Sequence, residues 1–308
     1  MKGLALAERF FRTHGIPMIE NQFAAHAHLI AAGLVGPGSE CFRFDDHLSR
    51  DHDWGPGFCL WLDKTDLEYF GSKLQSAYER LPKRFMGFGP RRCSPGEEHR
   101  VGVVGIQEFY QIYTGFDHPP NHVEEWLRIP EEALAICTNG RIFQDPAGDF
   151  SSWRQKLLQY YPEDVRIYKI ATCCVRAAQS GQYNFRRSFK RQEWFALRYA
   201  EIQFCDDALS LTFLLNKSYA PFYKWRHRAV RDLSVLGQTI YDGIAALMTC
   251  SDNVQKTRII DQICNELVKE MKQQKLTDSG SDFLLDHVQS MKDKLDNPNL
   301  RKRFSMVS

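Results

Sequence analysis

Two aspartates separated by one residue, Asp51 and Asp53, have the spacing in this chain that most directly suggests chemistry. If both lie on a strand, the two-residue period of the strand places their carboxylates on the same face. Neighbouring carboxylates repel each other, and a cation between them relieves that cost. Mg²⁺ suits this position because it takes hard oxygen ligands and keeps positions open for water and phosphate. The pair therefore predicts a magnesium site.

A glycine–serine pair, Gly38-Ser39, precedes the two aspartates across a gap of eleven residues. Glycine lets the backbone approach a ligand closely, and a serine hydroxyl with neighbouring N–H groups can bind phosphate oxygens. Arg50, directly before the first aspartate, could add positive charge for the same phosphates. The alternative is a solvated acidic loop, since runs of charge are usually exposed. The spacing and the Trp-Gly-Pro stop at residues 54–56 favour the phosphate site.

The pattern Gly38-Ser39, eleven residues, Asp51-His52-Asp53-Trp54 resembles the nucleotidyltransferase motif of the DNA polymerase beta-like superfamily. The longer string FDDHLSRDHDWGP, residues 44–56, resembles more specifically a bacterial domain-of-unknown-function family in that superfamily, numbered 4037. In the second half, LNKSYAPFYKW, residues 215–225, is similar to the substrate-side helical domain of aminoglycoside nucleotidyltransferases. Together these segments extend the resemblance over most of the chain.

The resemblance implies a Mg²⁺-dependent nucleotidyltransferase that moves a nucleoside monophosphate from ATP or another nucleoside triphosphate to a hydroxyl of a small-molecule acceptor. Asp51 and Asp53 would hold Mg²⁺ on the triphosphate, where it acts on the α-phosphate and the pyrophosphate leaving group. Gly38 and Ser39 would contact the β- and γ-phosphates. Catalysis would consist mainly of positioning and charge neutralisation.

The second half offers three further candidates. Lys224 is expected to contact phosphate, with Tyr219 as a stacking or hydrogen-bonding neighbour. Glu201 falls on a largely apolar side of an expected helix, so it is a candidate general base toward the acceptor hydroxyl. The alternative for Glu201 is an ordinary ion pair with Arg198 or another basic neighbour.

A third carboxylate, which the superfamily usually places on a later strand, is missing from its expected position. The expected strand at residues 101–106 (VGVVGI) carries no acid, while Glu98 precedes it and Glu108 follows it. This departure keeps a second hypothesis open, a nucleotide-binding or regulatory module without transfer activity. A third hypothesis is an adenylyltransferase that modifies another protein.

Histidines and basic residues near these candidates have simpler explanations. On a strand, His52 would point its ring to the face opposite the two aspartates, which predicts a structural histidine. The basic cluster at residues 224–231 is local, and the formal net charge of the chain is only +2. Nucleic-acid substrates are therefore ranked below small molecules.

Length and composition set the frame for these sites. The chain has 308 residues, 43% hydrophobic and 25% charged, which is typical of about two globular domains. The chain contains no apolar run of 18 residues, so we expect no membrane span. The nine cysteines form no Cys-x-x-Cys pair, so we expect reduced thiols and a cytoplasmic protein. The oligomeric state is left open.

The pattern of turns divides the chain into two expected domains. Residues 1–150 are rich in proline and glycine and predict an α+β, nucleotidyltransferase-like domain with a small mixed sheet and flanking helices. Residues 151–308 predict an all-α helical bundle on the substrate side. Expected helices cover 4–13, 22–32, 65–81, 107–113, 153–160, a segment from 162, 192–215, 221–236, 237–249, 252–274 and 281–295; expected strands cover 31–35, 53–54, 57–62 and 101–106.

Overall fold

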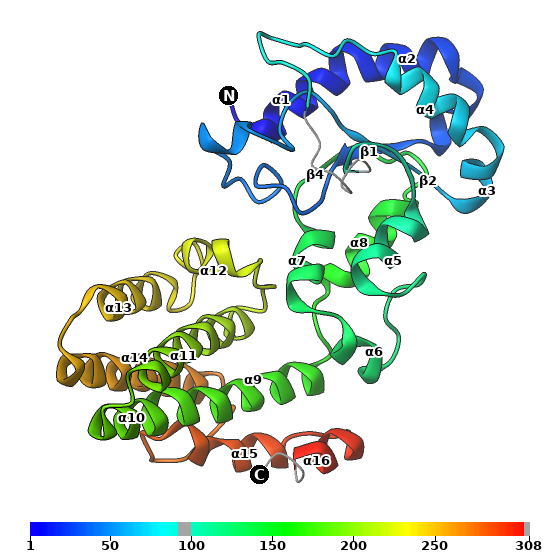
Figure 1. Ribbon diagram of the computed structural model, residues 1–308. Coiled ribbons are helices and arrows are strands. Elements are labelled where there is room, and N and C mark those ends of the chain that lie inside the picture. The colour runs from blue at the N-terminus through cyan, green and yellow to red at the C-terminus, as the bar shows by residue number, and fades with distance from the viewer. Residues whose placement is uncertain (92–99, 305–308) are drawn as a thin grey trace. The chain divides into compact units, whose positions relative to one another are not determined.

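The computed structural model describes residues 1–91 and 100–304 (Figure 1). Contacts between Cα atoms divide the chain into two compact units, the first ending at Gln159 and the second beginning at Tyr160. The first unit mixes helices with a small sheet, and the second is built from helices. None of the described helices is both long and apolar enough to cross a membrane.

The sheet of the first unit has four strands in the order β3-β2-β1-β4. Strand β1 pairs antiparallel with β2 and with β4, while β2 pairs parallel with β3. The sheet is therefore mixed, as the sequence predicts. The strands are β1 (Ala31–Leu34), β2 (Cys59–Leu62), β3 (Gly102–Gly105) and β4 (Arg141–Gln144).

Strand β2 is buried on both faces of the sheet, which explains its unbroken apolar sequence. Leu60 and Leu62 belong to the core cluster that includes residues of the N-terminal helices. Trp61 points to the other face, where its ring stacks on Phe150 at 3.9 Å and meets Phe109 edge-on. The two-residue period of the strand thus holds helices on both sides of the sheet (Figure 1).

The helices of the first unit follow the predicted pattern in part. The helix expected at 65–81 forms as α3, a π-helical segment and α4, and the helix expected at 107–113 forms as α5. The helix expected at 22–32 is wrong, because a 3₁₀ segment, Ala24–Leu29, leads directly into β1. The helices are α1 (Gly3–Phe10), α2 (Ile16–Gln22), α3 (Lys64–Asp66), α4 (Ser72–Glu79), α5 (Ile106–Thr114), α6 (Val123–Arg128), α7 (Glu131–Thr138) and α8 (Asp149–Leu158).

Helix α8 belongs to the first unit, so the expected boundary after residue 150 falls inside a helix. Its Phe150 stacks on Trp61 of β2, and its Trp153 stacks on Tyr110 of α5 with ring centroids 4.4 Å apart. Aromatic burial of this kind stabilises a helix–sheet contact beyond the area it removes from water.

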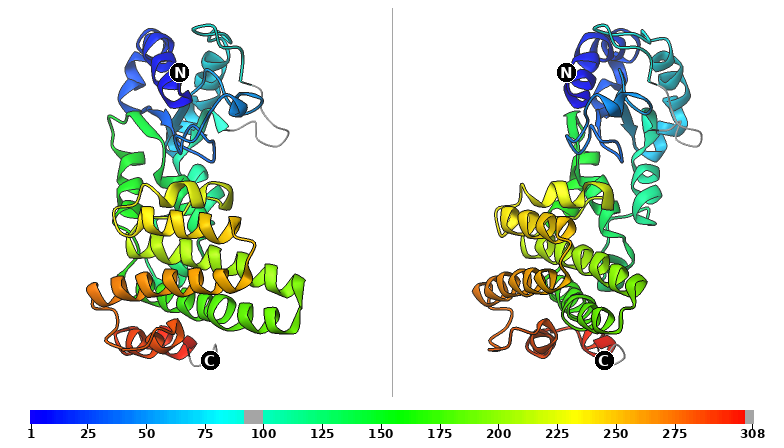
Figure 2. Two further views of the ribbon diagram at one scale, coloured as in Figure 1. Left: turned by 90° about the vertical axis from the view of Figure 1, so that its left-hand side faces the viewer. Right: turned by 60° about the vertical axis from the view of Figure 1, so that its left-hand side comes forward.

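Helix α11 is the central element of the second unit, where it contacts α9, α12, α13 and α14 (Figure 2). Its last two turns are almost entirely buried, as expected for a helix surrounded by others. The helices are α9 (Glu163–Ala177), α10 (Arg186–Arg191), α11 (Trp194–Leu215), α12 (Tyr223–Val230), α13 (Gly237–Thr249), α14 (Asn253–Gln273), α15 (Val288–Asp293) and α16 (Pro298–Phe304).

Eight cysteines fall in the described part of the chain, and all eight are free thiols. Seven are buried and Cys250 is half-buried. Burial raises the pKa of Cys59 to about 12, so this thiol stays protonated at neutral pH. Cys93 lies outside the described residues.

A fully buried histidine is expected to make the stability of the second unit depend on pH. His287 Nδ1 accepts from the Thr277 hydroxyl and its Nε2 donates to the Ser281 carbonyl, both at 2.9 Å. Burial lowers the pKa of His287, because the charged imidazole is poorly solvated there. Below the ordinary histidine pKa, the unfolded chain therefore binds a proton that the folded chain does not.

We expect the free energy of unfolding to fall between pH 7.5 and pH 5, with a contribution from His287 of at most about 2 kcal/mol. Urea unfolding at a series of pH values measures it. The His287→Gln variant should be less stable at pH 7.5 and should lose part of this pH dependence. An unchanged pH dependence in that variant would contradict the assignment.

Candidate functional site

The candidate residues of the first unit lie on the long connection between β1 and β2. Directly after β1 the chain forms tight turns, in which Cys41 N–H donates to the Gly38 carbonyl at 3.0 Å. Phe44 N–H donates to the Ser39 carbonyl at 2.9 Å. These turns hold Gly38 and Ser39 in a folded loop rather than in an extended one. Ser39 is half-buried.

Gly38 is required by space rather than by backbone conformation. A Cβ at this position would lie 2.4 Å from Oε2 of Glu40, which is too close for any real contact. Glu40 has little freedom to move, because its carboxylate is 2% exposed and paired with Arg91. The glycine therefore makes room for a buried carboxylate in the same turn.

We expect Gly38→Ala to destabilise the chain by about 1–3 kcal/mol through overpacking. Gly280→Ala is the matched control, since a Cβ there meets nothing within 4 Å, and it should leave the melting temperature nearly unchanged. Thermal unfolding of both variants measures the difference. Equal melting temperatures would show that the Glu40 carboxylate is not fixed.

The expected strand under Asp51 and Asp53 is wrong. Residues 51–53 form bends after a short 3₁₀ segment, and the strand begins only at Cys59. Asp51 is exposed, whereas Asp53 is 5% exposed and has a left-handed backbone with φ of 51°. A non-glycine residue in this region is uncommon and is retained only where the surrounding structure holds it. In this loop conformation, successive side chains do not alternate between two faces as they would on a strand. The prediction that the two carboxylates share a strand face therefore does not apply.

His52 lies between the two carboxylates and not on an opposite face. Its Nδ1 is 3.0 Å from Oδ2 of Asp53, and its Nε2 is 3.7 Å from Oδ1 of Asp51. The side chain of Asp53 also faces Arg100, whose Nη1 is 3.9 Å away. The expectation that strand alternation separates His52 from the aspartates is therefore wrong, because the segment is not a strand.

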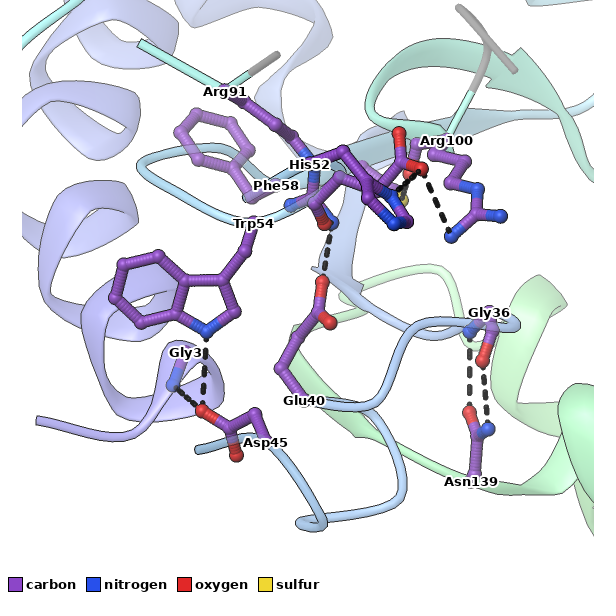
Figure 3. A network of polar contacts seen from close by, with 12 residues as sticks. Gly3, Gly36, Glu40, Asp45, His52, Trp54, Phe58, Arg91, Arg100 and Asn139 are labelled. Atoms are coloured by element: carbon purple, nitrogen blue, oxygen red, sulfur yellow. Dashed lines mark hydrogen bonds and ion pairs between the residues drawn. The ribbon is translucent and has the colours of Figure 1, made fainter. Parts of the chain in front are cut away.

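Arg91 connects the Gly-Ser turn with the aspartate loop (Figure 3). Its Nη2 donates to the carboxylate of Glu40 and also, at 2.5 Å, to the backbone carbonyl of Asp53. Burial alone would lower the pKa of Arg91, but the charge of Glu40 reverses this and raises it. The guanidinium therefore stays charged and holds both halves of the motif in one place.

A second anchor ties the same loop to the N-terminus (Figure 3). The buried carboxylate of Asp45 accepts from Gly3 N–H at 2.7 Å and from the Trp54 indole at 3.1 Å. At the other end of the connection, the Asn139 side chain pairs with both the N–H and the carbonyl of Gly36. These contacts leave the backbone on both sides of the candidate motif well supported.

A pocket of about 340 Å³ lies beside the aspartate loop. Arg50 and Asp51 line it with Trp54, and the guanidinium of Arg50 lies 5.0 Å from the Trp54 ring centroid. The remaining lining residues are Arg84, Phe88, Gly89 and Pro90. Two cations beside aromatic walls suit an anionic ligand, since arginine presents several donors to phosphate oxygens.

A third carboxylate is not placed at the expected position. Strand β3 carries no acid, and Glu108 caps α5 by accepting from Gly105 N–H at 3.4 Å. Glu98 lies outside the described residues. Within residues 1–91 and 100–304, no group of three or more histidine, cysteine or acidic side chains could hold a metal.

Glu201, on α11 of the second unit, is an ion-pair residue. Its side chain is 1% exposed and contacts the ammonium of Lys256 and, at 2.8 Å, a guanidinium nitrogen of Arg198. This is the ion-pair alternative that the sequence leaves open. Both carboxylate oxygens of Glu201 are thus occupied by cations of the second unit itself.

Tyr219 and Lys224 also belong to the second unit. Tyr219 precedes α12 and packs against the rings of Tyr160 and Tyr161. Lys224 is exposed on α12, with its ammonium 4.4 Å from the Trp225 ring centroid. Of the basic cluster around it, Arg226 is already paired with Asp206.

Sequence reasoning misses the residues that connect the motif. Arg91 and Glu40 are far apart in the sequence, and no periodic pattern links them. The sequence contains one indication of this ion pair, the pattern Gly38-x-Glu40. An acid that is buried beside a glycine turn requires a cation as its partner. For Asn139, the only indication of a structural role in the sequence is the glycine that follows it.

Comparisons with known proteins bear on one stretch of the chain. No curated protein and no solved structure matches the chain. The matched stretch contains Glu201, Tyr219 and Lys224 but not the connection that carries Gly38 and Asp53. Residues 126–226, about a third of the chain, match the family model described as a domain of unknown function, DUF4037, and the chain is close to that family.

Proposed function

We propose that the first unit binds a nucleoside triphosphate with Mg²⁺ and transfers its nucleoside monophosphate to a hydroxyl of a small-molecule acceptor. The observation that carries the proposal is the double contact of Arg91 with Glu40 and with the Asp53 carbonyl. It joins the glycine–serine turn to the aspartate loop, the two parts that the nucleotidyltransferase motif requires side by side. The finer fold assignment, a nucleotidyltransferase-like arrangement of the sheet, is part of this proposal.

The donor set of the aspartate loop fits Mg²⁺. Magnesium is commonly bound by one or two carboxylates together with substrate phosphates and waters, so Asp51 and Asp53 are sufficient in number. His52 contacts one carboxylate and lies near the other, so the two carboxylates lie on either side of the same ring. The bound metal would neutralise the charge that develops on the phosphates and the pyrophosphate.

The residues around the loop have separate tasks in this proposal. The Ser39 hydroxyl, together with Arg50 and Arg84 in the adjoining pocket, would bind phosphate oxygens. Arg91 would keep the serine and the aspartates at a fixed separation without touching the substrate. In the reaction, the acceptor oxygen forms a bond to the α-phosphorus, the bond to the bridging oxygen of pyrophosphate breaks, and the hydroxyl proton is released. Glu201 has no role in it.

The second candidate is a nucleotide-binding module without transfer activity. It is favoured by one observation, the absence of any described three-member donor group around Asp51 and Asp53. This candidate predicts triphosphate binding without pyrophosphate release.

Pyrophosphate release in the presence of Mg²⁺, the four ribonucleoside triphosphates and a small-metabolite extract distinguishes the two candidates. The transferase predicts release by the wild type and a loss of about a thousandfold or more in Asp51→Asn and in Asp53→Asn. Asp117→Asn, which changes an exposed aspartate elsewhere in the first unit, should keep full activity. Nucleotide binding without any release would support the module, and equal release by all variants would contradict both.

A further inference from the structure

The second unit exposes aromatic side chains at one end of α11. Phe195 is 86% exposed, Tyr199 is 64% exposed and Trp194 is 56% exposed. Phe195 and Tyr199 are four residues apart, so they share a face of the helix, and their rings lie 6.4 Å apart at an angle of 21°. Large exposed aromatic groups gathered in this way usually mark a binding surface.

Basic residues are frequent in the segment that carries these rings, and two of them, Arg186 and Arg198, are paired with Asp261 and Glu201. The segment 183–199 contains five basic residues and one acid, Glu193. Lys190 and Arg191, at the end of α10, are exposed, and neither side chain has an ion pair or hydrogen bond within the described part of the chain. Arg187 lies over the ring of Tyr183, with 4.8 Å between the guanidinium carbon and the ring centroid. We name these residues, with Trp194, Phe195 and Tyr199, the α10–α11 surface.

A pocket of about 440 Å³ opens at this surface, a volume typical of ligand sites. Phe195 and Tyr199 form part of its wall. Its polar groups are the carboxamides of Gln179, Asn184 and Gln203, with Arg176 and two serines. The guanidinium of Arg176 is held in place by Asp207, whose Oδ1 is 2.7 Å from Nε. Carboxamides present both donors and acceptors, as the edge of a nucleobase does.

Part of the pocket wall comes from a π-helical segment, Ala178–Phe185. Such segments are rare and are frequently found at functional sites. Its Gly181 lets the ring of Phe204 approach so closely that a Cβ would lie 2.3 Å from the ring. This contact fixes the segment against α11.

We propose that the α10–α11 surface binds single-stranded nucleic acid, with bases stacked on Phe195 and Tyr199 and one base in the adjoining pocket. Exposed rings, unpaired cations and carboxamides are the three elements that such a ligand requires, for bases, phosphates and base edges respectively. A duplex hides its base faces and leaves the rings without a partner. The proposal goes beyond the proposed function and does not rest on it.

Fluorescence anisotropy of the full chain with a labelled single strand of about 12 nucleotides tests the proposal. RNA and DNA strands of one sequence are compared, together with the duplex. We expect the single strands to bind more tightly than the duplex and the binding to weaken as salt rises. Phe195→Ala with Tyr199→Ala should weaken binding by about tenfold or more. Ala196→Trp, which fills the pocket, should also weaken it.

Matched variants separate stacking and charge from general effects. Ile202→Ser removes an exposed apolar residue farther along α11 and should leave affinity unchanged. Lys190→Ala with Arg191→Ala should weaken binding and reduce the salt dependence by about one to two charges. Lys272→Ala with Lys294→Ala removes the same charge elsewhere in the second unit and should have little effect. Asp51→Asn with Asp53→Asn should bind the strand as the wild type does.

Several results would overturn the proposal. These are no binding of any single strand, or equal losses in the surface variants and their controls. Binding to phosphatidylserine vesicles without binding to a strand would assign the surface to a membrane. A dimer that depends on Phe195 and forms without nucleic acid would assign it to a second copy of the chain.

Discussion

Glu201→Ala is expected to destabilise the chain by about 3–5 kcal/mol. The substitution leaves the ammonium of Lys256, which is 1% exposed, without its carboxylate partner. An unpaired charge at this depth is far more costly than the loss of the attraction itself. Urea unfolding, followed by circular dichroism, measures the free energy of unfolding.

The partners of Glu201 provide the controls. Arg198→Ala removes the second cation, but that side chain is 60% exposed, so we expect a loss of only about 1 kcal/mol or less. Glu201→Leu combined with Lys256→Met removes both buried charges and should be much less destabilising than either single change. A double variant as unstable as the sum of the singles would contradict a direct ion pair.

Arg91→Met is expected to destabilise the first unit by about 3–5 kcal/mol and to weaken nucleotide binding. It leaves Glu40 buried without a cation and releases the Asp53 carbonyl. Arg91→Lys retains the charge but offers a single compact donor group in place of a planar fork. We therefore expect Arg91→Lys to recover part of the stability and little of the nucleotide affinity.

Arg84→Met is the matched control for Arg91. Arg84 is exposed at the rim of the pocket beside Asp51, so its replacement should change stability by no more than about 0.5 kcal/mol. It should nevertheless weaken triphosphate binding, because the proposal places Arg84 on a phosphate oxygen. Equal stability losses in the Arg84 and Arg91 variants, measured by urea unfolding, would contradict the account of the buried pair.

Elements with strong local patterns were predictable from the sequence. The helix α13 begins and ends as predicted, and α11 and α14 differ from prediction by two residues or fewer at each end. The apolar strands β2 and β3 were located for the same reason. Strand β4 was missed because Arg141–Gln144 has no apolar run, and it forms through pairing with β1. Such pairing is a long-range effect that local propensity does not contain.

The candidate site was predictable in its residue types but not in its geometry. The spacing of Gly38 and Asp53 points to the connection between β1 and β2, yet the strand expected there is a series of bends. The contacts that define the loop involve Arg91, Gly3 and Asn139, each far from it in sequence. These contacts form only when the helices and strands pack together, and the spacing of residues within one segment does not specify that packing.

Isothermal titration of the purified chain with Mg²⁺-ATP, beside the Asp51→Asn, Asp53→Asn double variant, tests the central claim most directly. The account predicts binding by the wild type that requires Mg²⁺ and is lost in the double variant. The other three triphosphates are titrated in the same way. If no triphosphate binds the wild type, or if the double variant binds as tightly as the wild type, the aspartate loop is not a nucleotide site.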